Sequence, residues 1–218
     1  MSDKIELTGM VLLSQPVGDY DKRIVVLTKE FGKITCFARG ARRVNSALLA
    51  STDPFTFGDF ELFPGKDAYS VAKVTVKEHF RDLTENPTVA MYGFYFLEVV
   101  NYYTRENLDA TDYLKLLYVS LKALLSDKVS LKLVRRIFEY KAMQLFGEYP
   151  VLEEEDGTHT KACKYAFYYN VQSRIEKLYT FTVTDDVLKE MGEVIDKFRD
   201  THIDRKFNSL EMLHLQID

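Results

Sequence analysis

Over the first eighty residues, apolar and polar positions alternate with a period of two, which is the pattern of half-buried β-strands. Gly9 is expected to break the first strand and Gly58 to place a bulge in the fourth. Phe31-Gly32 supplies the turn of a central hairpin. Five strands are therefore predicted, at 5–15, 24–27, 34–38, 55–63 and 69–76, with a short helix at 45–50.

Five strands with a helix after the third form the layout of an OB-fold, a partly open barrel whose sheet face binds oligonucleotides. In the third strand, Lys33, Thr35 and Phe37 should share one face, while Ile34 and Cys36 share the other. One face is then core, and the other pairs cations with an aromatic ring. The phenylalanines of the fourth strand are expected in the core and rim rather than as base-stacking platforms: Phe55, Phe57, Phe60 and Phe63.

After Arg81 the apolar period changes to about 3.6 residues, which predicts amphipathic helices. The first follows Asn86-Pro87, the second spans about 110–125, and the third begins at Ser130 and ends with Gly147 as its C-cap. These helices are too apolar to stand alone, so a bundle is expected.

The pattern of the C-terminal part predicts a mixture of elements. An acidic connector at 153–156 should lead to a small strand pair, at 165–171 and 177–183. Thr184 should cap a helix from 187 to about 199, and a last helix should cover 208–215. The expected class is α+β: an OB-fold domain at 1–81, followed at 82–218 by a mainly helical domain with a small strand pair.

Charge is unevenly distributed along the chain. The sequence carries a formal net charge of −4, yet seven cations face Glu30 alone between Lys22 and Val44. A basic island in an acidic chain indicates where a polyanion would bind, although a solvated basic loop gives the same pattern. Phe37 between Lys33 and Arg39 favours the first interpretation, since single-strand binders combine a stacking ring with phosphate-neutralising cations.

Composition is that of a globular protein, with 46% hydrophobic and 28% charged residues. No long apolar segment is present, so a cytoplasmic protein that binds no membrane is expected. Cys36 and Cys163 cannot form a disulfide framework. His159 with Cys163 supplies at most two ligands of a metal site, and the run 153–156 is more often a solvated linker than a cation site.

Motifs for catalysis are missing: there is no phosphate-binding glycine loop, no G-x-S-x-G and no H-E-x-x-H. The four histidines are scattered without ligand spacing. We therefore expect no enzyme activity, no cofactor and no bound metal.

An ordered series of short motifs resembles the bacterial RecO family of recombination mediators from end to end. The series begins with G-x-V-L-L at 9–13, Gly18-Asp19-x-Asp21, Leu27-Thr28-x-Glu30-x-Gly32-Lys33 and Ala38-Arg39-Gly40-Ala41-Arg42-Arg43 with Ser46. It continues with Pro54-Phe55, Glu98, Arg136-x-Phe138-Glu139, Leu145-Phe146-Gly147-x-x-Pro150 and Phe207-Asn208-Ser209-Leu210.

The resemblance implies an N-terminal OB-fold on a helical domain and a non-enzymatic, nucleoid-associated role in DNA repair. Proteins of this family bind single- and double-stranded DNA, anneal strands coated with single-strand-binding protein, and act with RecR to let RecA load. Many members carry a four-cysteine zinc module after the third helix. Here that region, 151–183, has only Cys163, which indicates that the module is degenerate.

Two surfaces are predicted to carry the function. Phosphate contacts and one stacking ring are assigned to the first domain: Lys22, Arg23, Lys33, Phe37, Arg39, Arg42 and Arg43. Docking of the acidic C-terminal tail of single-strand-binding protein is assigned to cations of the third helix: Lys132, Arg135, Arg136 and Lys141. The alternative function is a protein-interaction adaptor whose OB-like unit no longer binds DNA.

Overall fold

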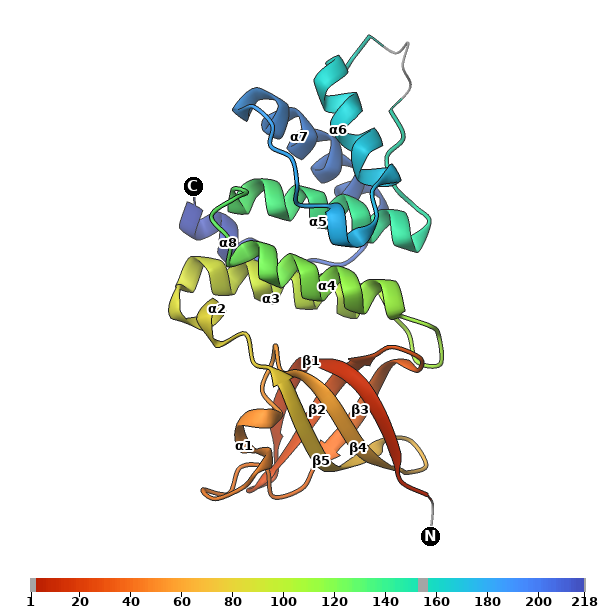
Figure 1. The fold of residues 1–218 in the computed structure, drawn as a ribbon, viewed down its shortest axis with the longest axis vertical. Helices are drawn as coiled ribbons and strands as arrows, with labels where there is room; N and C mark the ends of the chain where they lie inside the picture. The colour runs from red at the N-terminus through yellow and green to blue at the C-terminus, as the bar shows by residue number, and fades with distance from the viewer. Residues whose placement is uncertain (1–2, 153–156, 218) are drawn as a thin grey trace. The chain divides into compact units, whose positions relative to one another are not determined.

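The computed structural model describes residues 3–152 and 157–217 (Figure 1). Its contacts divide the chain into two compact units, Met1–Arg81 with Thr104–Leu114, and Asp82–Tyr103 with Lys115–Asp218. The elements of the first part are β1 (Ile5–Val17), β2 (Asp21–Thr28), β3 (Gly32–Ala38), α1 (Leu48–Ser51), β4 (Phe57–Pro64) and β5 (Tyr69–Glu78). Helical elements follow: α2 (Arg81–Glu85), α3 (Pro87–Tyr103), α4 (Thr111–Leu124), α5 (Leu131–Phe146), α6 (Lys161–Gln172), η1 (Ile175–Lys177), α7 (Asp185–His202) and α8 (Asn208–Ile217).

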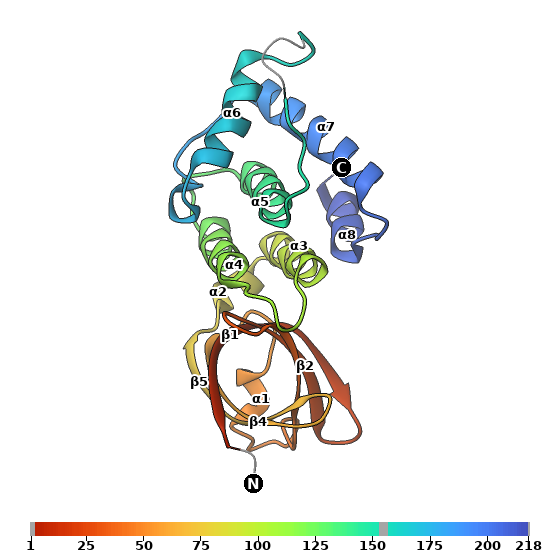
Figure 2. The same ribbon diagram turned by 90° about the vertical axis from the view of Figure 1, so that its right-hand side faces the viewer.

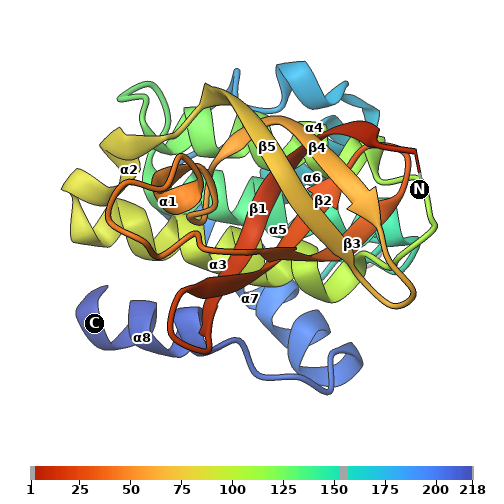
Figure 3. The same ribbon diagram turned by 90° about the horizontal axis from the view of Figure 1, so that it is seen from below.

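The five strands form a closed barrel in the order β1-β2-β3-β5-β4, which confirms the OB-fold prediction (Figure 2). All neighbours pair antiparallel except β3 and β5, which pair in parallel. The long loop from β3 to β4 contains α1 (Figure 3). Alternate strand residues fill the interior and are almost completely buried: Leu7, Val11, Ile24, Val26, Ile34, Cys36, Ala38, Phe60, Leu62 and Val71.

The sequence pattern predicts a break at Gly9, but β1 continues through this residue. It pairs with Thr28 on one side and Gly58 on the other, so β1 closes the barrel through this point. A Cβ at Gly9 would fall 2.5 Å from the carbonyl oxygen of Leu27, so glycine permits the close approach of the strands. The bulge expected at Gly58 is confirmed by a register shift between Phe57 and Gly58.

The segment between α3 and α4 groups with the barrel rather than with the helices. Its backbone pairs with the β2–β3 turn, since Lys33 N donates to Arg105 O at 3.1 Å and Asn107 N donates to Phe31 O at 2.9 Å. Ala110 N also donates to Lys29 O at 2.9 Å. The sequence did not indicate this return to the barrel.

The helical unit has a core of aromatic and aliphatic side chains from α3, α4, α5 and α7. The rings of Phe96 and Phe138 stack with their centroids 3.9 Å apart. Ser130 caps α5 as predicted, and Gly147 ends it in the left-handed conformation, with a φ of 96°. Thr184 caps α7 through Val187 N, which was also expected.

The predicted strand pair is wrong. Residues 165–171 belong to α6, which Thr160 caps at its N-terminus, and residues 177–183 include the end of η1 but no strand. The buried residues Cys163, Ala166, Phe167 and Asn170 recur at helical spacing and form one face. Aromatic content had favoured a strand, but this spacing and the Thr160 cap determine a helix.

The acidic run 153–156 lies outside the described residues. Among the described helices, none is both long and apolar enough to cross a membrane.

Candidate nucleic-acid interface

The β2–β3 hairpin separates core and solvent as its alternation predicts. Ile34, Cys36 and Ala38 are completely buried, whereas Lys33 is half-buried and Phe37 is 37% exposed. Burial raises the pKa of the Cys36 thiol to about 12, with a smaller contribution from the Glu106 carboxylate. The outer face of the hairpin is therefore the one that can meet a ligand.

A row of outward side chains crosses the barrel from strand to strand. Gln15 pairs with Arg23, Arg23 with Phe37, Phe37 with Ser70, and Ser70 with Phe63. The Arg23 guanidinium donates to Gln15 Oε1 at 3.3 Å. Phe63 is 46% exposed, so it extends the aromatic surface, although the sequence gave it a packing role. The row thus holds two rings and one guanidinium, with the small Ser70 between the rings.

At one end of this row, the β1–β2 turn and the loop after β3 are hydrogen-bonded to each other. The Asp21 carboxylate accepts from Gly40 N at 2.7 Å, and Arg42 N donates to Tyr20 O at 2.8 Å. The Arg42 guanidinium also donates to the carbonyls of Gly18 and Asp19, both at 3.2 Å. These bonds hold the basic loop in one conformation beside the turn.

Tyr20 is a third surface ring, and the sequence analysis did not predict its role. It is 53% exposed, and the Arg43 guanidinium carbon lies 5.2 Å from the centre of its ring. The only sequence signal was an aromatic residue inside the Gly18–Asp21 turn. Together with exposed Arg39, this pair gives the basic loop two cations and a stacking face.

Lys22 is placed differently from the other predicted cations. Only 8% of it is exposed, and its ammonium donates to Leu49 O at 2.6 Å and to the Asp53 carboxylate at 2.8 Å. Lys22 lies two positions before Ile24, so both side chains are on the inner side of β2. Its hydrogen bond to Leu49 O anchors α1 to the barrel. Lys22 is therefore a structural cation, and the remaining six predicted residues lie on the outer surface or at its edge.

Cations of α5 form part of a buried ion network instead of a simple charged stripe. Arg135 Nε contacts Glu139 at 2.9 Å, and Arg136 contacts Glu139 at 2.9 Å and Asp196 of α7 at 2.7 Å. Arg199 contacts Asp196 at 2.6 Å, and Tyr95 donates to Glu139 at 2.6 Å. Burial alone would raise the pKa of Glu139, but the three guanidiniums hold it at about 2.

Beside this network, α5, α7 and α8 enclose a hollow of about 500 Å³. Lys132, Arg135, Arg136 and Lys189 line it, with Leu188 and Leu213 among the apolar lining residues. Nη2 of Arg135 is buried and has no hydrogen-bond partner among the described residues. Asp185, Glu193 and Asp196 also line it, so this hollow combines charges of both signs with apolar surface.

Lys141 does not reach this hollow. Its buried ammonium donates to the carbonyls of Asn170, Val171 and Ser173, at 3.1 to 3.2 Å. It therefore satisfies the C-terminal carbonyls of α6 and leaves no charge for a partner.

The residues predicted as weak metal ligands have other contacts. His159 Nδ1 lies 3.2 Å from Glu190, and Cys163 is buried, with its pKa raised to about 12 by burial and, secondarily, by Glu190. Within 3–152 and 157–217, no group of three or more ligand-type side chains is placed to hold a metal.

Two family models match this chain over most of its length. The model described as Recombination protein O N terminal matches residues 1–80, and the model described as Recombination protein O C terminal matches residues 85–173. The chain belongs to the RecO family. This RecO-family protein is thus a DNA repair protein with an OB-fold barrel and a helical region.

Curated relatives of this RecO-family chain support the same family assignment. DNA repair protein RecO of Alkaliphilus metalliredigens is 37% identical over 148 residues, which cover 68% of this chain and 60% of that protein. The RecO protein of Acetivibrio thermocellus is 27% identical over 241 residues and covers 96% of both chains. That of Caldicellulosiruptor bescii is 34% identical over 143 residues, which cover 66% of this chain and 58% of that protein.

Motif residues that carried the resemblance make structural contacts. Glu98 of α3 accepts hydrogen bonds from the backbone N–H and the hydroxyl of Ser209 in α8. Arg136 and Glu139 meet in the ion network, and Asp21 meets Gly40 beside the basic loop. Much of the family pattern therefore specifies the fold that presents the two surfaces.

Proposed function

We propose that the outer face of the barrel binds single-stranded DNA and that the protein anneals complementary strands, without catalysing a covalent reaction. The observation that carries this proposal is the row of Arg23, Phe37 and Phe63 beside the Tyr20–Arg43 pair. Unpaired bases stack on exposed rings, and guanidiniums neutralise the phosphates between them. A duplex hides its base faces, so its phosphates would meet only the cations.

Binding by this face should be indifferent to sequence. The contacts that it offers are ring faces and charged groups, which recognise features shared by all nucleotides. Among the described residues of this unit, α1 has only four residues, too few to lie in a groove and read base edges. Tolerance of sequence is what a protein needs if it is to pair any two complementary strands.

A charge-reversal variant tests the assignment. Arg39→Glu, Arg42→Glu, Arg43→Glu should weaken oligonucleotide binding strongly and lower the slope of log affinity against log salt by about 2, since each lost phosphate contact is worth about 0.7 on a single strand. Lys4→Glu, Lys73→Glu, Lys77→Glu makes the same charge change on other exposed positions of the barrel unit. If both triple variants behaved alike, net charge rather than this face would govern binding.

A fluorescence reporter tests stacking directly. The chain contains no tryptophan, so Phe37→Trp places a single indole on the row. A base stacked on the indole should quench its emission on addition of a poly-dT oligonucleotide, and duplex DNA should quench it less. Unchanged emission at saturating oligonucleotide would exclude Phe37 from the contact. If no other measurement detected oligonucleotide binding either, the adaptor alternative would be favoured.

For the helical unit, we propose that the hollow beside α5 receives the acidic C-terminal tail of single-strand-binding protein. Such a tail has carboxylates and apolar end residues, which suit the lining cations and leucines. Nη2 of Arg135 is buried 3.6 Å from the Asp196 carboxylate but makes no hydrogen bond to a described residue, so it can donate one to a carboxylate of the tail.

Lys132 and Lys189 are exposed, so their reversal can test this without breaking the ion network. Lys132→Glu, Lys189→Glu should reduce the affinity for a fluorescent acidic tail peptide at least tenfold, whereas Lys122→Glu, Lys197→Glu should not. Equal loss in both variants would point to general charge attraction.

From the resemblance, we further propose that the protein acts with RecR to let RecA load on coated strands. Co-sedimentation of the two proteins, with and without single-stranded DNA, tests this step. A RecA-loading assay that shows no stimulation in the presence of both would contradict it.

A further inference from the structure

A second basic and aromatic surface lies on α6, in a part of the chain to which no function was assigned. Lys161, Lys164, Tyr165, Tyr168 and Gln172 fall within an arc of about 100° on this helix, given 3.6 residues per turn. The buried face, with Cys163 and Phe167, lies opposite. We call the five residues the α6 face.

The rings of the α6 face are unusually open to solvent. Tyr165 is 66% exposed and Tyr168 is 61% exposed, more than any ring of the barrel row. Side chains three positions apart on a helix are neighbours, so the two rings form one apolar surface, and contiguous exposed apolar surface can mark a binding site. Beside them, Tyr165, Tyr169 and Phe181 line a hollow of about 500 Å³ between α6 and residues 181–187.

Aromatic contacts organise the floor of this hollow. The rings of Tyr165 and Tyr169 have centroids 6.5 Å apart, and Tyr169 meets Phe181 edge-on at 5.0 Å. The Tyr169 and Thr180 hydroxyls are hydrogen-bonded at 3.0 Å, which fixes the inner ring. A flat apolar group can therefore lie against Tyr165 without displacing a packed side chain.

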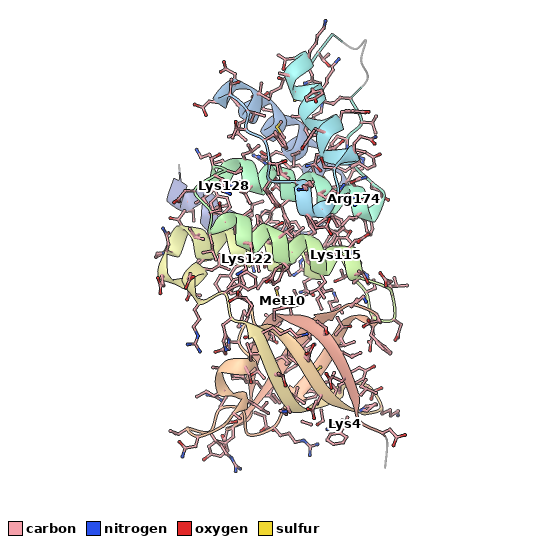
Figure 4. The ribbon with its side chains drawn as sticks, in the orientation of Figure 1. Lys4, Met10, Lys115, Lys122, Lys128 and Arg174 are labelled. Carbon is pink, nitrogen blue, oxygen red and sulfur yellow. The ribbon has the colours of Figure 1, made fainter. Side chains whose placement is uncertain are left out.

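Charge selects the kind of occupant. Between Lys161 and Lys177 the chain carries four cations, Lys161, Lys164, Arg174 and Lys177, against Glu176 alone, although its overall charge is −4. Arg174 is exposed at the end of α6, and Figure 4 labels it on the side of this unit that also carries Lys115 and Lys122 of α4. A polyanion with flat apolar faces suits this combination.

Acidic side chains limit the site at its other end. Asp185 and Asp186 begin α7 next to Thr184, which lines the hollow. The Glu190 carboxylate accepts from Thr160 N at 2.7 Å, so it is engaged at the start of α6. The phosphates should therefore run from Lys164 toward Arg174 and Lys177, just beyond the C-terminal end of α6, with the bases against Tyr165 and Tyr168.

We infer that the α6 face is a second binding site for single-stranded nucleic acid, so that each unit of the protein holds one strand. This inference rests on the proposed function, because annealing requires two strands to be held. It also explains why two segments of an acidic chain concentrate cations beside exposed rings.

Tyr168→Trp supplies a unique reporter, because the chain has no other tryptophan. In the Arg39→Glu, Arg42→Glu, Arg43→Glu background, a single-stranded oligonucleotide should still quench this indole, with reduced total affinity. Phe94→Trp, on an exposed ring of α3, is the matched reporter and should not respond. A silent Tyr168→Trp at oligonucleotide saturation would overturn the inference.

Removing the rings gives the functional test. Tyr165→Ala, Tyr168→Ala should lower the residual affinity of the charge-reversed background at least tenfold, since each removed ring loses a stacked base. In the parent background it should leave binding of one strand within twofold but slow two-strand annealing. Tyr165→Phe, Tyr168→Phe keeps both rings and should behave as the parent.

The outcomes separate this inference from the barrel proposal. If the arginine variant bound like the parent, the barrel assignment would fail while the tyrosine result still decided the α6 face. If annealing were normal in the double alanine variant, the α6 site would be rejected. If that variant lost affinity for an acidic peptide but not for an oligonucleotide, the surface would be a protein-docking site and the inference would be wrong.

Discussion

Charged side chains of this protein have partners that lie far away along the chain. The outward side chains of β3, Lys33 and Phe37, instead follow from strand alternation alone. Lys22 was misjudged because its partner, Asp53, lies 31 residues away. The ion pair of Arg136 was equally hard to predict, since its partner Asp196 is 60 residues distant. Side-chain charge is visible in a sequence, whereas its pairing depends on the fold.

Glu139 is the residue that should make the stability of the helical core most sensitive to acid. Its folded pKa of about 2 lies below the ordinary 4.5, so its stabilisation is complete above pH 4.5 and is lost as pH falls toward 2. Glu139→Gln should cost about 3–5 kcal/mol at neutral pH, because it leaves buried guanidiniums uncompensated. It should also flatten the acid side of the stability profile, measured by urea unfolding from pH 2 to 7. An unchanged profile would show that Glu139 is not the titrating group.

Gly32 and Gly18 offer a matched pair for backbone strain. Both have positive φ, 61° and 54°, but a Cβ at Gly32 would meet the carbonyl oxygens of Arg105 and Leu108, whereas one at Gly18 would meet nothing within 4 Å. Gly18→Ala should cost about 1–2 kcal/mol for the left-handed conformation alone. Gly32→Ala should cost clearly more, in the same denaturant titration, because residues 104–110 must move. Equal losses would mean that this segment is not held against the turn.

Elements were predicted well where their end signals were strong. Ser130, Gly147 and Thr184 fixed helix ends through caps that depend only on neighbouring residues, and Gly58 marked its bulge. α6 was mistaken for a strand because aromatic content outweighed the spacing of Cys163, Ala166, Phe167 and Asn170. The return of residues 104–114 to the barrel could not be predicted, since it depends on backbone hydrogen bonds and not on a side-chain pattern.

The pairing of α5 with α6 provides a prediction at this scale. Lys141→Met should remove three charge-assisted hydrogen bonds to the end of α6 and destabilise the helical unit by about 2–4 kcal/mol, since bonds to charged groups contribute about 1.5–3 kcal/mol each and are not additive. Hydrogen exchange of the amides at 167–175 should speed up. Lys132→Met, at an exposed position of α5, should leave both measurements unchanged. Protection retained in Lys141→Met would assign the stability of α6 to apolar packing alone.

Across the whole molecule, the two cysteines report on the two units separately. Cys36 lies in the barrel and Cys163 in the helical unit, and burial raises both thiol pKa values to about 12. At pH 8 both should react very slowly with a thiol reagent, because little thiolate is present, and both should react fully in denaturant. Labelled-peptide mass spectrometry can then follow each unit.

The same experiment tests the expectation that no structural zinc is bound. A strong chelator should change neither the labelling rate of Cys163 nor the melting temperature, and elemental analysis should give much less than one zinc per chain. Faster labelling of Cys163 after chelation, together with a stoichiometric metal content, would contradict this expectation.

The return of residues 104–114 to the barrel has a consequence for exchanging gene segments between relatives. In a chimera with its junction after Arg81, the β2–β3 turn would come from one parent and residues 105–110 from the other. The backbone groups of Arg105, Asn107 and Ala110 would then have to form their hydrogen bonds with a turn from a different protein. Main-chain bonds tolerate different side chains, but the oxygens facing Gly32 do not tolerate a shifted loop length. Functional chimeras should therefore inherit 1–81 and 104–114 from the same parent. The coding unit for this barrel is thus interrupted by residues 82–103, which belong to the other unit.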